Sequence, residues 1–238
     1  MSTVEGSSRQ AQLSAGTLTS SLVSRIREKI LSGTLVPGEK IRLEELRASF
    51  DVSLSPIREA LSRLAAERYV ISEEQKGFRV APVSRANLLE VTQLRQELEP
   101  IALREAIRLG GDAWEANLYS AFHMLKKYEL QETDEADGDG ETLREWEHWH
   151  RNFHYSLISG SNRPLMVQFC ETLHDFNDRY RRLFLSKHAF DAHVASEHQS
   201  ILRATIARDS DLAVDLLQQH ISRTSANLIE AVGASLDA

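Results

Sequence analysis

Apolar residues recur along most of the chain at intervals of three and four, which is the period of a helix with one buried face. Between residues 18 and 33 this stripe consists of Leu22, Val23, Ile26, Ile30 and Leu31. Gly33 favours a stop, and Pro37-Gly38 favours a turn. A short helix is predicted over residues 43–50, so two helices open the first third of the chain.

A third helix is predicted to begin near Ser53 or Ser55, either of which can cap its first turn. Pro56 suits that turn, because a missing N–H costs little there. The inward face carries Ile57, Leu61 and Leu64. Two short strands around a turn are predicted from the segment that follows, YVISEEQKGFRVAPV. Three helices and a hairpin in about 65 residues are the layout of a winged helix-turn-helix.

From residue 86 onward the apolar pattern is helical throughout. A long amphipathic run covers residues 86–111, and further helices are predicted over about 112–130, 141–160, 163–187, 191–208 and 210–232. The sequence therefore predicts a mainly α protein, with an N-terminal winged helix-turn-helix followed by an all-α helical-bundle effector domain. The expected organisation is a disordered lead-in (1–16), a winged helix-turn-helix domain (17–83), a linker (84–87) and a helical ligand-binding and dimerisation domain (88–233).

The distribution of charge separates these two domains. Residues 1–85 hold 13 Lys and Arg against 10 Asp and Glu, which leaves 15 against 25 for the remainder of the chain's 28 and 35. A mildly basic front favours an N-terminal module that faces a polyanion. The single cysteine, Cys170, excludes an intramolecular disulfide framework and fits a reducing cytosol. With no apolar run near the ~20 residues that span a bilayer, and a polar N-terminus unlike a signal peptide, we expect a cytoplasmic protein with no membrane partner.

Several motifs of the first third occur together: Pro-Gly at 37–38, Val-Ser at 52–53, PIREAL at 56–61 and GFRV at 77–80. With this set the segment resembles the DNA-binding domain of the GntR family of bacterial transcription regulators. The resemblance implies a homodimer that reads paired half-sites in double-stranded operator DNA. Leu54 and Glu44 stand where other members carry basic residues, so the operator sequence does not follow from the resemblance.

Arg58 is the strongest candidate for reading a base, because it lies in the first turns of the third helix and can donate to guanine O6 and N7. Ser53 and Ser55 lie at the start of that helix, where hydroxyl and N–H groups suit phosphate. Further contacts to the DNA backbone are expected from Arg42, Arg63, Lys76 and Arg79. The alternative is a solvated charged face on which Arg58 pairs with a nearby glutamate.

The segment EHWHRNFH, residues 147–154, holds three histidines. His150 and His154 share one helix face, whereas His148 points about 200° away from His150. Two antiparallel helices could bring His198 and His220 toward the same face. Three or four imidazoles in a bundle core suit a divalent transition metal, and the alternative is a neutral cluster that binds a ligand through hydrogen bonds. The remaining candidates are interpreted as ordinary histidines: His123, His174, His188 and His193.

Four segments of the second half, LRQELEPIALREAI, FHYSLISGSNRPLM, EHQSILRATIARDSDLA and QQHISR, resemble the FCD-type effector domain of the FadR-like GntR branch. The resemblance implies a metal held by an Asp, a His four residues later, and two His on the last two helices. His154, His198 and His220 match the three histidine positions, and His150 stands at the Asp position. An all-imidazole set shifts the preference toward zinc or nickel and away from harder ions.

The resemblance also implies a small organic-acid effector, with Arg95 and Arg182 as candidate carboxylate clamps, although Arg95 could instead pair with Glu99 at i+4. The sequence has no HExxH helix and no arrangement for a Ser or Cys nucleophile. We therefore expect a ligand-responsive transcription regulator, by default a repressor released by its effector, and not an enzyme. The alternatives are a metal-dependent hydrolase or lyase with a fused helix-turn-helix, and a metal sensor.

Overall fold

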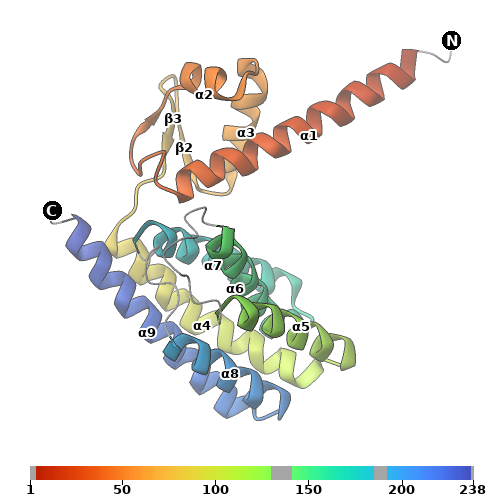
Figure 1. Ribbon diagram of the computed structural model, residues 1–238, viewed down its shortest axis with the longest axis vertical. Helices are drawn as coiled ribbons and strands as arrows, with labels where there is room; N and C mark the ends of the chain where they lie inside the picture. Colours follow the sequence, from red (N-terminus) through yellow and green to blue (C-terminus); the bar gives the residue numbers. More distant parts are fainter. Residues whose placement is uncertain (1–3, 130–140, 185–191, 237–238) are drawn as a thin grey trace. The chain divides into compact units, whose positions relative to one another are not determined.

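The computed structural model describes residues 4–129, 141–184 and 192–236, and it divides into one unit that runs to Val83 and one that starts at Ser84 (Figure 1). The first unit is a winged helix-turn-helix and the second is all-helical, so the predicted fold class is confirmed. Among the described helices, none combines the length and the apolar character needed to cross a membrane.

The first unit contains α1 (Val4–Leu31), β1 (Lys40–Ile41), α2 (Leu43–Phe50), α3 (Leu54–Ala66), β2 (Val70–Glu73) and β3 (Gly77–Val80). Its core contains the predicted inward faces of α1 and α3, including Ile26, Ile30, Ile57, Leu61 and Leu64, all fully buried. The strands form an antiparallel sheet in the order β1-β3-β2. The two-residue strand β1 was not predicted, because two residues are too short to show an alternating pattern.

Helix α1 starts much earlier than expected. The sequence predicted a disordered lead-in over 1–16, but the helix extends back to Val4, and residues 1–3 lie outside the described part of the chain. No proline interrupts residues 4–31. Once the packed turns from Thr19 onward are helical, each further residue gains one hydrogen bond without a new nucleation cost, so the helix can continue.

The second unit is a bundle of α4 (Arg85–Leu109), α5 (Asp112–Glu129), α6 (Glu141–Ser159), α7 (Pro164–Phe184), α8 (Ala192–Ile206) and α9 (Ser210–Leu236). Helix α4 packs against α9 and α7, α5 packs against α6, and α8 packs against α9 (Figure 1). The core includes Leu103, Leu118, Phe153, Ile201 and Leu217. The predicted helix ends at 187 and 191 fall in residues 185–191, which lie outside the described residues.

The expected linker over 84–87 is shorter in the structure. Ser84 caps α4 by accepting a hydrogen bond from the Asn87 backbone N–H at 3.1 Å, so α4 begins at Arg85. A serine at this position satisfies one of the free N–H groups of the first turn, which makes helix formation favourable here. Most of the predicted linker is therefore the first turn of the second, helical unit.

Candidate functional site

Helices α6, α8 and α9 bring the four predicted histidines together. The ring centroids of His150 and His154 on α6 lie 4.6 Å apart, and His198 on α8 lies 5.1 Å from His150 and 5.4 Å from His154. His220 on α9 lies 4.9 Å from His198 and stacks on His154 at 5.1 Å. One nitrogen from each ring lies within 4.8 Å of the others, and all four side chains are buried.

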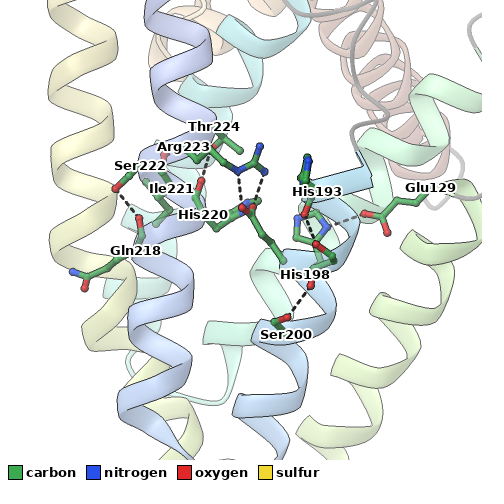
Figure 2. Close-up of polar contacts among 12 residues, drawn as sticks. Glu129, His193, His198, Ser200, Gln218, His220, Ile221, Ser222, Arg223 and Thr224 are labelled. Carbon is green, nitrogen blue, oxygen red and sulfur yellow. Dashed lines mark hydrogen bonds and ion pairs between the residues drawn. The ribbon is translucent and has the colours of Figure 1, made fainter.

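Two carboxylates hold two of these rings from behind. The Nδ1 atom of His198 lies 2.8 Å from Glu129 Oε1 (Figure 2). Nδ1 of His220 lies 2.8 Å from Glu197 Oε2. Arg223 donates to both oxygens of Glu197, at 2.5 and 2.7 Å. A hydrogen bond from Nδ1 to a carboxylate places the ring's lone pair on Nε2 and fixes the orientation of the ring.

The surroundings of the cluster favour the neutral form of its imidazoles. Burial lowers the pKa of both His150 and His154 well below the usual 6.5, with Arg181 adding to the effect at His150 and the neighbouring histidines adding to it at both. At His220 burial outweighs the hydrogen bond to Glu197 and lowers the pKa to about 4. Neutral rings keep the lone pairs that metal ligation requires.

Four ring nitrogens of these histidines have no hydrogen-bond partner within the described residues. These atoms are Nδ1 of His150, both ring nitrogens of His154 and Nε2 of His198. Buried polar atoms are rarely left without a partner, because the loss of water costs free energy. A divalent transition metal would engage such lone pairs, and borderline ions of this kind favour imidazole ligands. The residues at the site therefore fit the metal that the sequence predicts.

His174 on α7 also lies at this site, although the sequence predicted an ordinary histidine there. Its ring centroid is 5.2 Å from that of His154, and its Nε2 lies 3.2 Å from Glu99 Oε1. Glu99, His154 and His174 form a second group with candidate ligand atoms within 4.8 Å of one another. A signal was available, because His174 occupies the inward face of α7 together with Val167 and Cys170.

The two candidate carboxylate clamps lie in different surroundings. Arg95 is buried and donates through Nε to Glu99 at 2.6 Å, the i+4 pairing that was the alternative. Burial by itself would raise the pKa of Glu99, but Arg95 and His174 lower it to about 2, so this carboxylate is ionised. Because Glu99 also contacts His174, Arg95 lies beside the histidines. Arg182 pairs with Glu147 on α6 at 2.9 Å.

The predicted DNA-reading residues surround the start of α3. A groove between α3 and the β2–β3 wing is lined by residues that include Arg42, Arg58 and Lys76. Ser53 is the N-cap of α3 and makes no capping bond through its side chain, and Ser53 and Ser55 are both exposed. Arg58 is exposed on α3, off the buried stripe that contains Ile57.

Arg58 differs from the other predicted DNA-contacting arginines. Arg42 pairs with Glu45 at 2.8 Å, Arg63 with Glu59 at 2.7 Å, and Arg79 with Glu73 at 2.9 Å. Arg79 also donates to the Gly38 carbonyl at 2.6 Å. In contrast, no acidic side chain of the described residues pairs with Arg58. Its guanidinium is therefore available to a base without first breaking an ion pair.

A winged helix-turn-helix joined to a helical domain with a buried polar site defines a DNA-binding transcription regulator. Comparison with known proteins identifies its family. Residues 18–80 match the bacterial regulatory proteins of the gntR family, and residues 90–223 match the FCD domain. The chain belongs to the GntR family and carries an FCD effector domain, as the sequence motifs predicted.

Individual relatives agree with this assignment. The chain is 34% identical to the HTH-type transcriptional repressor GlaR of Escherichia coli over 82% of this chain and 89% of that protein. It is 32% identical to the HTH-type transcriptional regulator BphR of Paraburkholderia xenovorans, over 88% and 84%. The fold matches the solved structure of E. coli McbR/YncC with a TM-score of 0.69 at 22% identity, covering 90% of this chain and 97% of that one.

Proposed function

We propose that this regulator is a homodimeric repressor that dissociates from operator DNA when a small organic acid binds to it. The acid binds in the helical domain, beside a metal ion held by histidines. The observation that carries the proposal is the buried cluster of His150, His154, His198 and His220. Ring nitrogens of the first three lack hydrogen-bond partners among the described residues. A few polar groups that converge inside a domain are typical of a ligand-binding site. FCD domains often bind metal, which agrees with the cluster.

Zinc or nickel is the proposed metal, because the four ligands are imidazoles and carry no charge of their own. When bound, such an ion attracts carboxylate oxygens as a Lewis acid. His198 and His220 would present Nε2 to it, since their Nδ1 atoms are engaged by Glu129 and Glu197. His150 and His154 complete the set from one face of α6.

Arg95 is the proposed clamp for the effector's carboxylate. It is buried beside the histidines and carries a guanidinium that can donate two parallel hydrogen bonds to a carboxylate. Glu99 holds it in place and neutralises it until a second anion arrives. Arg182 on α7, which forms an ion pair with Glu147, adds positive charge to the proposed effector site. A small acid with one or two carboxylates suits these groups.

On the DNA side, Arg58 is proposed to read a base, with Ser53 and Ser55 at the phosphates and with Arg42, Arg63, Lys76 and Arg79 on the flanking backbone. Two copies would read two half-sites of the operator. A surface suited to pairing two copies lies on α4 and α7, which pack against each other and carry exposed apolar side chains: Leu94, Ile101, Leu165 and Phe169. Leu165 and Phe169 are 64% and 54% exposed and border one apolar recess.

The first test is the metal content of untagged protein purified without chelator, measured by elemental mass spectrometry. We expect about one equivalent of zinc or nickel per chain and its loss in His154→Ala. His148→Ala is the matched control, because His148 lies on the same helix but is exposed and bonded to Asn152. Protein that takes up no metal even after incubation with zinc or nickel would contradict the metal site.

The second test distinguishes an effector-controlled repressor from a metal sensor and from an enzyme. Operator affinity is titrated with a panel of small organic acids at constant metal, and we expect one of them to weaken binding. If metal alone changes operator affinity with no organic acid present, the protein is a metal sensor. Steady turnover of an ester or acid that is lost in His154→Ala would instead support a hydrolase or lyase.

A further inference from the structure

Three carboxylates lie directly behind the histidine cluster, and they differ in what balances their charge. Glu197, bonded to His220, is also bonded to Arg223 through both oxygens. Glu99, in contact with His174, is bonded to Arg95 at 2.6 Å. Each of these two carboxylates is therefore matched by the opposite charge of an arginine.

Glu129 is different, because no arginine or lysine of the described residues pairs with it. It is the last residue of α5, its side chain is 7% exposed, and its Oε1 lies 2.8 Å from Nδ1 of His198 (Figure 2). The nearest lysine along the helix, Lys127, lies over the Tyr128 ring at 5.3 Å. Glu129 therefore faces the cluster as a carboxylate whose one described polar partner is a metal-ligand candidate.

Four neutral imidazoles around a divalent ion leave a buried site with two uncompensated positive charges. Such a charge is costly in a low-dielectric interior unless a counter-charge lies close by. The pairs Glu197–Arg223 and Glu99–Arg95 are each neutral as units and contribute little net charge. Glu129 stands one imidazole away from the proposed metal position, and its charge is not cancelled by an arginine or lysine of the described residues.

We propose that Glu129 is the counter-charge of the metal site: through His198 it supplies the negative charge that the all-histidine ligand set lacks. This inference rests on the proposed metal. It assigns Glu129 a positioning and charge-balancing role, with His198 as the residue that contacts the ion. Carboxylates that hold a ligand histidine typically contribute 10- to 100-fold in metal affinity.

The test measures zinc affinity by competition with a fluorescent chelator. Glu129→Gln keeps the shape and an acceptor oxygen for His198 and removes only the charge, and we expect zinc to bind about 10- to 100-fold more weakly. Glu129→Asp keeps the charge and should lie nearer to wild type. The matched control is the double variant Arg104→Gln with Asp211→Asn, which removes an exposed ion pair of zero net charge from the same domain and should leave the affinity within a few-fold of wild type.

Two readouts separate a charge effect from damage to the fold or to the ligand set. Thermal melting of chelator-treated protein, followed by circular dichroism, should place Glu129→Gln within a few degrees of wild type. The visible spectrum of the cobalt-loaded variant should keep the wild-type band intensity, since the four ligands are unchanged. An altered cobalt spectrum would mean that Glu129 fixes the ring's position and not the charge, which overturns the assignment.

The outcomes also distinguish this inference from the proposed function. If wild type takes up no metal, the proposed metal site itself fails. If wild type binds zinc tightly and Glu129→Gln binds it equally well, only the role of Glu129 fails. Equal weakening in Glu129→Gln and in the neutral-pair control would likewise overturn the charge assignment, because the two changes differ in net charge.

Discussion

Gln218 on α9 donates its side-chain Nε2 to the backbone carbonyl of Gln96 on α4, 3.3 Å away. Four residues beyond Gln96 lies Pro100, which has no N–H and leaves that carbonyl without its helical partner. The Gln96 side chain in turn donates to Ser222 on α9 at 2.7 Å. A proline inside α4 is thus tolerated because the neighbouring helix supplies the missing donor.

Replacing this donor should weaken the effector domain. For Gln218→Ala we expect a loss of about 1 kcal/mol in the free energy of unfolding, since one carbonyl loses its partner. In a domain of this size that is a fall of about 3 °C in the melting temperature. Gln219→Ala is the control, because Gln219 is exposed on the same helix. Equal melting of the two variants would show that water replaces the lost bond without cost.

Arg58→Ala should remove specific DNA recognition and leave the fold intact, because the side chain is exposed and alanine favours the helix. Loss of one guanine contact should weaken binding to the operator by about 1–3 kcal/mol and binding to unrelated DNA far less. Lys76→Ala, in contrast, should weaken binding to both DNAs. It should also lower the slope of log affinity against log salt concentration by about one. Fluorescence anisotropy at several salt concentrations measures these effects. Equal losses on both DNAs for Arg58→Ala would place Arg58 at the backbone.

Tyr180 connects α7 to the start of α4. Its hydroxyl lies 3.1 Å from both the N and the O of Ser84 and 3.0 Å from Asn87 Oδ1. His174 at the histidine cluster lies on the same helix, so α7 connects the site physically to the first residue after the DNA-binding unit.

We therefore expect Tyr180→Phe to bind the effector normally but to lose much of the effector's influence on operator binding, by about 0.5–2 kcal/mol of coupling. The effector's affinity is measured by calorimetry, and operator affinity is measured with and without the effector. Tyr128→Phe is the control, since Tyr128 is a tyrosine of the same domain that lies on α5 instead of α7. Unchanged coupling in Tyr180→Phe would exclude this connection.

Acid should destabilise the chelator-treated protein through its buried histidines. For His220 the folded pKa of about 4 lies below the ordinary value of 6.5, so between these two pH values the unfolded chain binds the proton and the folded chain does not. The contribution of His220 to the free energy of unfolding is fully present above pH 6.5, falls as the pH drops, and levels off below pH 4. The total loss for this group is about 3 kcal/mol.

His150 and His154 shift in the same direction for the same main reason, burial. Urea unfolding at pH 7.5, 6 and 5 measures the combined slope. His220→Gln should make the slope shallower, because it removes one of the titrating groups. A slope that is the same with and without His220 would mean that folding does not lower the pKa of this ring.

Cys170 should be unreactive in the folded protein. It is fully buried in the core of the effector domain, and burial together with the nearby Glu99 raises the pKa of its thiol to about 12. The thiolate that attacks disulfide reagents is therefore scarce at pH 8. We expect no reaction with a chromogenic disulfide reagent in native protein and one thiol per chain in denaturant. Fast labelling of native protein would reveal local opening of α7.

Much of the fold could be predicted because helix formation and capping are local. The buried stripe of α3, the turn at Gly38 and the face shared by His150 and His154 depend on spacings of a few residues. The DNA-reading face follows for the same reason, since Arg58 lies off the apolar stripe of its own helix. These features would be the same in any packing of the helices.

The partners of each charged side chain could not be predicted in this way. Arg63 and Arg58 both lie on the exposed side of α3, yet Arg63 is paired with Glu59 and Arg58 is not. Arg95 pairs with Glu99 at a spacing that the sequence shows, but only burial by neighbouring helices makes that pair part of the site. Helix spacing lists the possible partners, and the surrounding structure selects among them.

The spacing of residues along the chain was enough to predict a DNA-reading module and a helical effector domain. It also predicted that two histidines share a face of α6. The tertiary structure decided that His198, His220 and His174 meet them, and that Glu129 and Glu197 stand behind two of the rings. The physical reason is that the helical period fixes which side chains share a face within one helix. Which faces then meet depends on how helices far apart in the chain pack against one another.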